Sequence, residues 1–363
     1  MKDLRPTGGA HAPALIVRAS AAAELLRLIG VLVDTDQDEY DVGTERIESL
    51  RERVGSATLA QLQALDGGSS VAFHVLSLLA ADLPDPAGVE ELVAALEGDP
   101  GLGWRLLLVH HATRELPANL SIAEAAVTGD TAALEEIRTR LAPLADRDAA
   151  GVVTLLETTP EDHGRHLLEA INAVRPLWEG LAHEAMEAIA RDVDARRAQL
   201  QAGTSVRDIV LDATNGYEPS GDPEVRRIVL LPSFWIRPWL VVGRRADAEI
   251  LTTVVAEEFL VLPARAPSPA LLKLFKALGD ESRLKLLRRM SSGPVSLTEA
   301  TAELDVAKAT AHHHLAILRQ AGLVTVSGEG RGSRYTLRGD PPQAAFEALR
   351  AYLTPGRDAG ADA

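Results

Sequence analysis

The sequence predicts a mainly α-helical protein in two parts, a long N-terminal helical domain with a few β-strands and a compact C-terminal domain. Three observations predict this organisation. Most of the chain places apolar residues three and four positions apart, which is the period of a helix. β-Branched and aromatic residues concentrate near 225–262, as is typical of strands. Three prolines within residues 263–269 then mark a linker.

The composition limits the class of protein. A chain of 363 residues with 46% hydrophobic residues is long enough for two domains with their own cores. Its apolar runs are far shorter than the roughly 20 residues of a spanning helix, and its N-terminus lacks the apolar core of a signal peptide. We therefore expect a cytoplasmic protein without a membrane segment. The 32 arginines against 5 lysines fit a bacterial genome rich in GC.

The charge is distributed unevenly. The net charge of the whole chain is −15, which disfavours nucleic acid as a partner. Residues 269–339, however, hold 11 Lys or Arg against 6 Asp or Glu, a net charge of +5, and the remainder holds 26 against 46, a net charge of −20. A nucleic-acid partner is therefore expected to bind this one basic segment.

The N-terminal domain is expected to span residues 14–262, after a disordered tail at 1–13. It begins with a predicted strand at 14–20 and a helix at 21–30, for which Ser20 is the expected N-cap. The strands predicted near 225–262 are expected to pair with the strand at 14–20. Further helical patterns occupy residues 44–54, 57–65, 89–98, 131–144 and the long segment 164–203.

The C-terminal domain is expected to span residues 270–353, followed by a second disordered tail at 354–363. Ser296 and Glu299 have the spacing of a capping box, which marks the start of a helix. Glycines are concentrated in the turn of the predicted hairpin. The predicted elements are helices at 269–280, 281–293, 296–304 and 306–322, a β-hairpin at 323–338 and a helix at 341–353.

Two short helices joined by a tight turn near Asp305 and Val306, with a hairpin after the second helix, form the pattern of a winged helix-turn-helix. The segments "LFKALGDESRLKLLRRM" and "LTEATAELDVAKATAHHHLAILRQAGLV", and the hairpin with Arg331 and Tyr335, resemble the ArsR/SmtB family of bacterial regulators. The resemblance covers about residues 270–340. It implies a homodimeric transcriptional regulator, expected to be a repressor, that binds a near-palindromic operator in double-stranded DNA.

In proteins of this kind, the helix after the turn enters the major groove and the wing reaches the backbone or the minor groove. An alternative for each wing arginine is a solvated loop charge. The residues that the resemblance places at DNA are Lys308, Ala309, Thr310, His312 and His313 on the helix, and Arg331 and Arg334 on the wing.

The consecutive residues His312, His313 and His314 raise the possibility of a metal site. Consecutive helical residues point about 100° apart, so the three imidazoles cannot converge on one ion. Ala311, Leu315 and Leu318 form the apolar stripe of this helix, so we expect His314 to pack and the other two histidines to face outward.

We expect no metal and no cofactor. The resemblance implies that a metal sensor would carry cysteines in the helix at 296–304, or His and acidic ligands in the helix at 341–353. The first helix has no thiol, and the second has a single carboxylate, Glu347. Asp162, His163 and His166, like His110, His111 and Glu115, have partial metal spacing and are interpreted as exposed helix polar residues.

The sequence indicates the function of the N-terminal domain less specifically than that of the C-terminal domain. Phe234, Trp235 and Trp239 are interpreted as sheet core or, alternatively, as a pocket for an unknown small-molecule effector. No nucleophile-elbow, Walker A or dinucleotide-binding pattern supports an enzyme, and we identify no catalytic residue. The rival hypothesis is an enzyme or partner-binding helical protein with an accessory DNA-binding segment.

Overall fold

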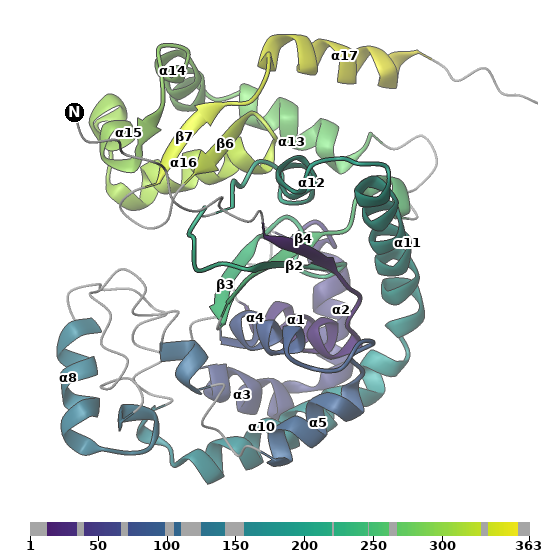
Figure 1. Ribbon diagram of the computed structural model, residues 1–363, viewed down its shortest axis with the longest axis vertical. Coiled ribbons are helices and arrows are strands. Elements are labelled where there is room, and N and C mark those ends of the chain that lie inside the picture. Colours follow the sequence, from purple (N-terminus) through teal and green to yellow (C-terminus); the bar gives the residue numbers. More distant parts are fainter. Residues whose placement is uncertain are drawn as a thin grey trace, which may run out of the picture. The chain divides into compact units, whose positions relative to one another are not determined.

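The computed structural model describes residues 13–34, 40–66, 72–98, 105–109, 125–141, 156–219, 221–245, 247–260, 267–327 and 333–354. The chain forms two compact units (Figure 1). Unit 1 comprises residues 1–209 and 221–255, and unit 2 comprises residues 210–220 and 256–363. The predicted tails, apart from Pro13 and Thr354, and residues 263–266 of the predicted linker lie outside the described residues.

The described residues are mostly helical with a few strands, as predicted. Unit 1 contains a four-stranded sheet of β1 (Ala14–Val17), β2 (Arg227–Ser233), β3 (Val241–Arg245) and β4 (Ala248–Val254). The strand order is β1-β2-β4-β3, in which β1, β2 and β4 are parallel and β3 is antiparallel to β4. The predicted pairing of the N-terminal strand with the later strands is confirmed, since Leu15 lies opposite Ile228.

Each helical segment predicted in unit 1 forms a helix, one of these segments is divided in two, and the helices at 72–81 and 206–213 were not predicted. The helical segment predicted at 164–203 forms two helices, because Gly180 ends the first and the amide of Leu181 bonds back to the carbonyl of Trp178. The bounds are α1 (Ala21–Val33), α2 (Thr44–Val54), α3 (Ser56–Asp66), α4 (Ala72–Leu76), η2 (Ser77–Ala81), α5 (Val89–Gly98), α8 (Thr131–Leu141), α10 (Pro160–Glu179), α11 (Ala182–Gln201) and α12 (Val206–Ala213), whose last residues belong to unit 2.

Helix α1 is the central helix of unit 1. Its predicted N-cap is confirmed, because the hydroxyl of Ser20 accepts a hydrogen bond from the amide of Ala23. Every residue from Ala22 to Val33 is buried, so α1 has no solvent-facing side. It packs against α3, α4, α5 and α10 as well as against β2. In Figure 1, α1 lies between the sheet and α10.

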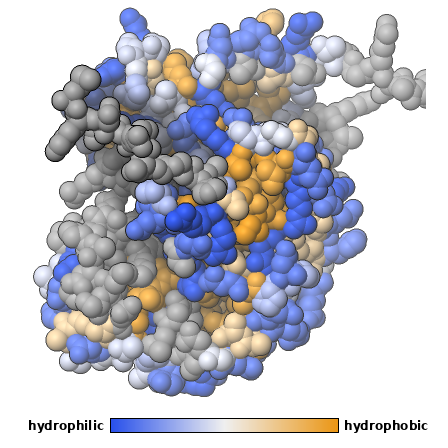
Figure 2. All heavy atoms as spheres, viewed as in Figure 1, coloured by the Kyte–Doolittle hydropathy of each residue, from blue (hydrophilic) through white to orange (hydrophobic). Residues whose placement is uncertain are grey.

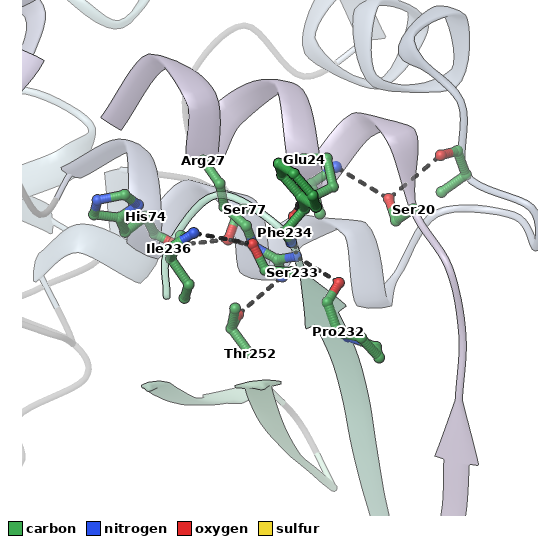
Figure 3. Close-up of polar contacts among 12 residues, drawn as sticks. Ser20, Glu24, Arg27, His74, Ser77, Pro232, Ser233, Phe234, Ile236 and Thr252 are labelled. Carbon is green, nitrogen blue, oxygen red and sulfur yellow. Dashed lines mark hydrogen bonds and ion pairs between the residues drawn. The ribbon is translucent and has the colours of Figure 1, made fainter. Parts of the chain in front are cut away.

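An ion pair inside this core ties α1 to the sheet (Figure 3). Arg27, whose side chain is 1% exposed, donates to Glu24 at 2.9 Å. The same guanidinium donates to the hydroxyls of Ser77 and Thr252 and to the carbonyl of Pro232. Burial lowers the pKa of Arg27, and the carboxylate of Glu24 opposes that effect. The second oxygen of Glu24 accepts from the amide of Phe234 at 3.0 Å, so each of the two charges has more than one hydrogen-bond partner.

Unit 2 contains α13 (Pro269–Leu278), α14 (Glu281–Met290), α15 (Leu297–Leu304), α16 (Lys308–Gln320) and α17 (Pro341–Leu353). Its sheet has the order β5-β7-β6, with β5 (Val295–Ser296) antiparallel to β7 (Arg334–Leu337) and β7 antiparallel to β6 (Val324–Ser327). The division into units differs from a single boundary at 263–269, because residues 210–220 belong to unit 2. The reason is that their backbone bonds to β6, as Glu218 to Val326 shows.

Hydrophilic residues cover most of the coloured surface in view in Figure 2. Among the described helices, none is both long enough and apolar enough to cross a membrane. The large apolar side chains that are more exposed lie mainly on α13, α14 and α17.

We predict that the Glu24–Arg27 pair dominates the stability of unit 1. Glu24→Gln leaves the charge of Arg27 buried without its anion, which should cost about 3–5 kcal/mol. Replacing both residues, as in Glu24→Gln with Arg27→Met, should cost less than Glu24→Gln alone. The measurement is urea unfolding followed by tryptophan fluorescence, because all four tryptophans belong to unit 1.

The matched control is Glu169→Gln, because Glu169 pairs with Arg165 on the exposed face of α10. This variant should unfold at nearly the urea concentration of the parent, since exposed pairs contribute little. Equal effects of the two Glu→Gln changes would contradict the assignment.

Candidate nucleic-acid interface

Helices α15 and α16 form a helix-turn-helix, and local sequence sets its turn. The predicted capping box of α15 is present, with the Ser296 hydroxyl accepting from the Glu299 amide and the Glu299 carboxylate accepting from the Ser296 amide. Asp305 ends α15 in the left-handed region, at φ 53°, and its amide bonds to the carbonyl of Thr301. Residues 305–307 separate the end of α15 from Lys308, where α16 begins.

The start of α16 differs from the starts of the other helices in unit 2. Side-chain oxygens of Ser268, Asp280, Ser296 and Asp340 cap α13, α14, α15 and α17. Ala307 precedes α16 and has no side-chain acceptor to offer. The first turn of α16 contains no acidic residue either. Its positive helix end is therefore suited to an anion such as a phosphate.

Most of the predicted helix residues of α16 are exposed in the structure. Lys308, Thr310, His312 and His313 are exposed. Ala309 belongs to the same first turn, but its side chain lies outside the described residues. The predicted buried stripe is confirmed, since Ala311, Leu315 and Leu318 are inaccessible. Helix α16 packs against α13, α14, α15 and β6, and the four exposed residues lie away from these contacts.

The wing is only partly described. Strands β6 and β7 pair as the predicted hairpin, with Val326 opposite Tyr335, and Arg331 lies outside the described residues. Arg334 is on β7 with its side chain 53% exposed, and its guanidinium donates to Glu299 of α15 at 2.7 Å. The same carboxylate caps α15. Arg334 is therefore held beside the helix-turn-helix but keeps an open side toward solvent.

His314 differs from the two histidines before it. Its imidazole is largely buried, and Nδ1 lies 3.8 Å from a carboxylate oxygen of Asp280, the N-cap residue of α14. Burial lowers the pKa of His314, the Asp280 charge opposes this, and Arg283 and His313 add to the lowering. The unfolded chain therefore takes up the proton more readily, and this histidine should make unit 2 less stable as the pH falls below about 6.5.

The predicted aromatic pocket residues of unit 1 follow the end of β2. Phe234 and Trp235 are buried with their rings edge to face at 5.2 Å, and Trp239 is partly exposed. The guanidinium of Arg46 lies 5.4 Å from the Phe234 ring centre and 5.1 Å from that of Trp235. The indole nitrogen of Trp235 is buried and has no hydrogen-bond partner among the described residues.

The clusters with partial metal spacing need one correction. His163 is buried on α10 rather than exposed, and burial together with the charge of Arg105 lowers its pKa to about 3. The exposed-polar interpretation was wrong at this residue because it faces the core beside Leu167, one helical turn later. His110, His111 and Glu115 lie outside the described residues. Among the residues described, no three His, Asp or Glu side chains form a metal-binding group.

Sequence reasoning missed one part of unit 2. Residues 214–218, which we call the strap, pair with β6, although they lie about 100 residues before it in the chain. The Asn215-Gly216 dipeptide was a signal for a tight turn, and both residues have positive φ. No local pattern indicates where such a turn packs.

Known proteins resemble the same segment. The family model described as a helix-turn-helix domain matches residues 278–327. The "Uncharacterized HTH-type transcriptional regulator YceK" of Bacillus subtilis is 37% identical over 70 residues, which are 19% of this chain and 70% of that protein. The "Biofilm growth-associated repressor" of Agrobacterium fabrum is 34% identical over 80 residues, 22% of this chain and 68% of that protein.

The "Transcriptional activator HlyU" of Vibrio cholerae is 33% identical over 76 residues, which are 21% of this chain and 70% of that protein. No solved structure matches the chain. The helix-turn-helix with its wing defines a DNA-binding regulator as the class of protein. Within that class, the chain belongs to the HTH-type transcriptional regulators.

Substitution of the exposed histidines should affect DNA affinity, whereas substitution of His314 should affect stability. His312→Ala with His313→Ala should weaken binding to a DNA duplex selected by the parent and change stability by less than about 0.5 kcal/mol. Fluorescence anisotropy of labelled DNA measures the affinity, and thermal unfolding measures the stability.

His314→Ala is the matched comparison on the same helix. It should lower the thermal stability of unit 2 through lost packing, as hydrogen exchange of α16 would report. If the double variant binds the selected DNA with the affinity of the parent, His312 and His313 do not contact DNA.

Proposed function

We propose that this chain is a homodimeric regulator of the ArsR/SmtB type that acts in the bacterial cytoplasm and represses transcription from a near-palindromic operator. The observation that carries the proposal is the open first turn of α16, which combines an uncapped helix end with the exposed side chains of Lys308, Thr310 and His312. Such a surface offers a positive charge, hydrogen-bond donors and amide groups to DNA phosphates and bases.

The proposed DNA contacts divide between α16 and the wing. The α16 side would read the major groove, because a helix fits that groove and its N-terminal residues reach base edges. Arg331 and Arg334 would contact the backbone or the minor groove. The residues proposed on α16 are Lys308, Ala309, Thr310, His312 and His313.

Repression is the simpler outcome of such binding. A protein that covers a promoter excludes RNA polymerase by occupancy alone, whereas activation needs an additional contact with polymerase. Of the relatives, one is named a repressor and another an activator. A reporter gene downstream of the selected operator would distinguish repression from activation, because a repressor gives higher reporter expression when the protein is absent.

Unit 1 is proposed to bind a small-molecule effector. The chain outside residues 269–339 has a net charge of −20, which disfavours contact with DNA. The aromatic turn of Phe234, Trp235 and Trp239 contains a buried indole donor without a partner among the described residues, and so could supply both an apolar surface and a polar contact. No metal or cofactor is part of this proposal.

The rival function is an enzyme or a partner-binding protein that uses DNA binding as an accessory. The matched relatives cover about a fifth of this chain, all through one segment, so they do not bear on unit 1. The favoured function rests on unit 2. A reaction catalysed by unit 1 would be a second activity of the protein, in addition to DNA binding by unit 2.

We predict that the full-length protein selects one DNA sequence from a random pool. The sequence should contain two inverted half-sites about one helical turn, ~34 Å, apart. Lys308→Ala should reduce the slope of log affinity against log salt by about one, as expected for one lost phosphate contact. A metabolite screen for release of the selected DNA, together with a change in tryptophan fluorescence, would then identify the effector.

Failure to enrich any sequence at low salt would contradict the proposed function. If the selected sequence contains a single half-site, the protein binds DNA as proposed, but not as a dimer.

Two helices of unit 2 carry the surface proposed for dimerisation. On α17, Phe346 is 62% exposed and Leu353 is 65% exposed. Leu272 and Phe275 are exposed on α13, which packs against α17. Exposed apolar side chains gathered on two adjacent helices are typical of an interface, and a second copy of the chain is the proposed partner because an inverted operator requires two-fold symmetry.

We predict that Phe346→Asp dissociates the dimer, because it would bury a carboxylate without a partner in the interface. Sedimentation of the full-length protein at micromolar concentration should shift from dimer to monomer, with weaker operator binding. Pro342→Asp is the control, since it adds the same charge at an exposed position in the first turn of α17, where a negative charge is favourable. A monomeric parent, with and without DNA, would rule out this assembly.

A further inference from the structure

The strap, residues 214–218, extends the sheet of unit 2. The amide of Val326 donates to the carbonyl of Gly216 at 2.8 Å, and the amide of Glu218 donates to the carbonyl of Val326 at 2.9 Å. Tyr217 and Val326 thus form a parallel bridge. Strand β6 is at the edge of the sheet, so the strap occupies backbone groups that an edge strand otherwise leaves open.

Asn215 connects the strap to two other parts of unit 2. Its amide nitrogen donates to the carbonyl of Gln320, the last residue of α16, at 2.6 Å. Its amide oxygen accepts from the guanidinium of Arg338, directly after β7, at 3.1 Å. Because a carboxamide has both a donor and an acceptor, one side chain links the end of the recognition helix to the strand that returns from the wing.

A second arginine reinforces this connection. The guanidinium of Arg319, in the last turn of α16, donates to the carbonyl of Thr214 at 3.1 Å. Tyr217 is buried, so the strap also contributes to the core of unit 2. The end of α16 is therefore held by contacts to two successive strap residues.

The backbone on both sides of the contact is shaped for close approach. Gly216 has φ +100°, and a Cβ atom there would lie 2.8 Å from the carbonyl oxygen of Val324. Gly322 has φ +70°, and a Cβ atom there would lie 2.9 Å from the Asn215 side-chain oxygen. Asn215 is itself in the left-handed region, at φ 54°. These positions fit glycine and asparagine, which adopt that region at the least cost.

We propose that the strap is a positioning element for DNA binding, which fixes the wing relative to α16, and that Asn215 is its central positioning residue. The inference rests on the proposed function, because both α16 and the wing must be DNA-contacting elements. The two elements must reach different parts of the DNA at the same time. A fixed geometry between them removes an ordering cost that would otherwise be incurred on binding.

The test uses the full-length protein and DNA that the parent selects from a random pool. Asn215→Gly removes both side-chain bonds and keeps a residue that adopts the left-handed backbone freely. Glu218→Pro is the second variant, because it removes the amide that donates to Val326. Asn172→Gly is the control, since it makes the same change at an exposed position of α10 and weakens a helix.

Hydroxyl-radical footprints and guanine-methylation protection separate the wing from the recognition helix. The strap variants should bind about tenfold more weakly, as expected for the loss of one or two hydrogen bonds. They should lose backbone protection on the flanks of each half-site while keeping major-groove protection at its centre. Asn172→Gly should keep the parent footprint even where its melting temperature is lower.

Every other pattern overturns the inference. An unchanged footprint in both strap variants means that the strap does not position the wing. If the strap variants lose DNA protection both on the flanks and at the centre of each half-site, the strap serves folding alone. If the parent itself protects no flank, the wing makes no DNA contact that the strap could position. A parent that selects no DNA fails at the proposed function, which is a distinguishable result.

Discussion

The core of unit 1 depends on the interaction between Arg27 and Glu24. Removing two charges from water is costly, and the cost is offset only where their remaining hydrogen-bonding groups have partners. Here the guanidinium reaches four acceptors, on α1, η2, β2 and β4. A single side chain therefore sets the position of the central helix against two strands and a neighbouring helical turn.

The same pair also shapes the aromatic turn that follows β2. Because one oxygen of Glu24 accepts from Arg27 and the other from the amide of Phe234, the turn begins at a point fixed by α1. Arg46 then lies over Phe234 and Trp235 from α2. A ligand that moved these rings would act on groups connected to the buried ion pair, which gives the proposed effector region a rigid base.

What the sequence could predict was set by the range of the interactions involved. The capping box of Ser296 and the buried stripe of Ala311, Leu315 and Leu318 lie within a few residues along the chain, so their spacing predicted both the helices and the open side of α16. Glu24 and Arg27 look like an ordinary surface pair at a spacing of three. Their burial follows from how α1 packs against the sheet and other helices, which no local pattern encodes.

Local sequence likewise does not predict where the strap packs, and the packing of the strap affects where the boundary between the two domains lies. A boundary drawn at 263–269 would assign residues 214–218 to the N-terminal part, although they bond to α16, β6 and the residue after β7. A fragment that began at the linker would lack Asn215 and the buried Tyr217, and the edge of β6 would be left open. Weak DNA binding by such a fragment would then reflect an incomplete unit 2 as much as the loss of unit 1. Residues 210–220 are joined to unit 1 at both ends, at residues 209 and 221. The segment that completes unit 2 is thus also a covalent connection to the part of the chain that is proposed to bind the effector.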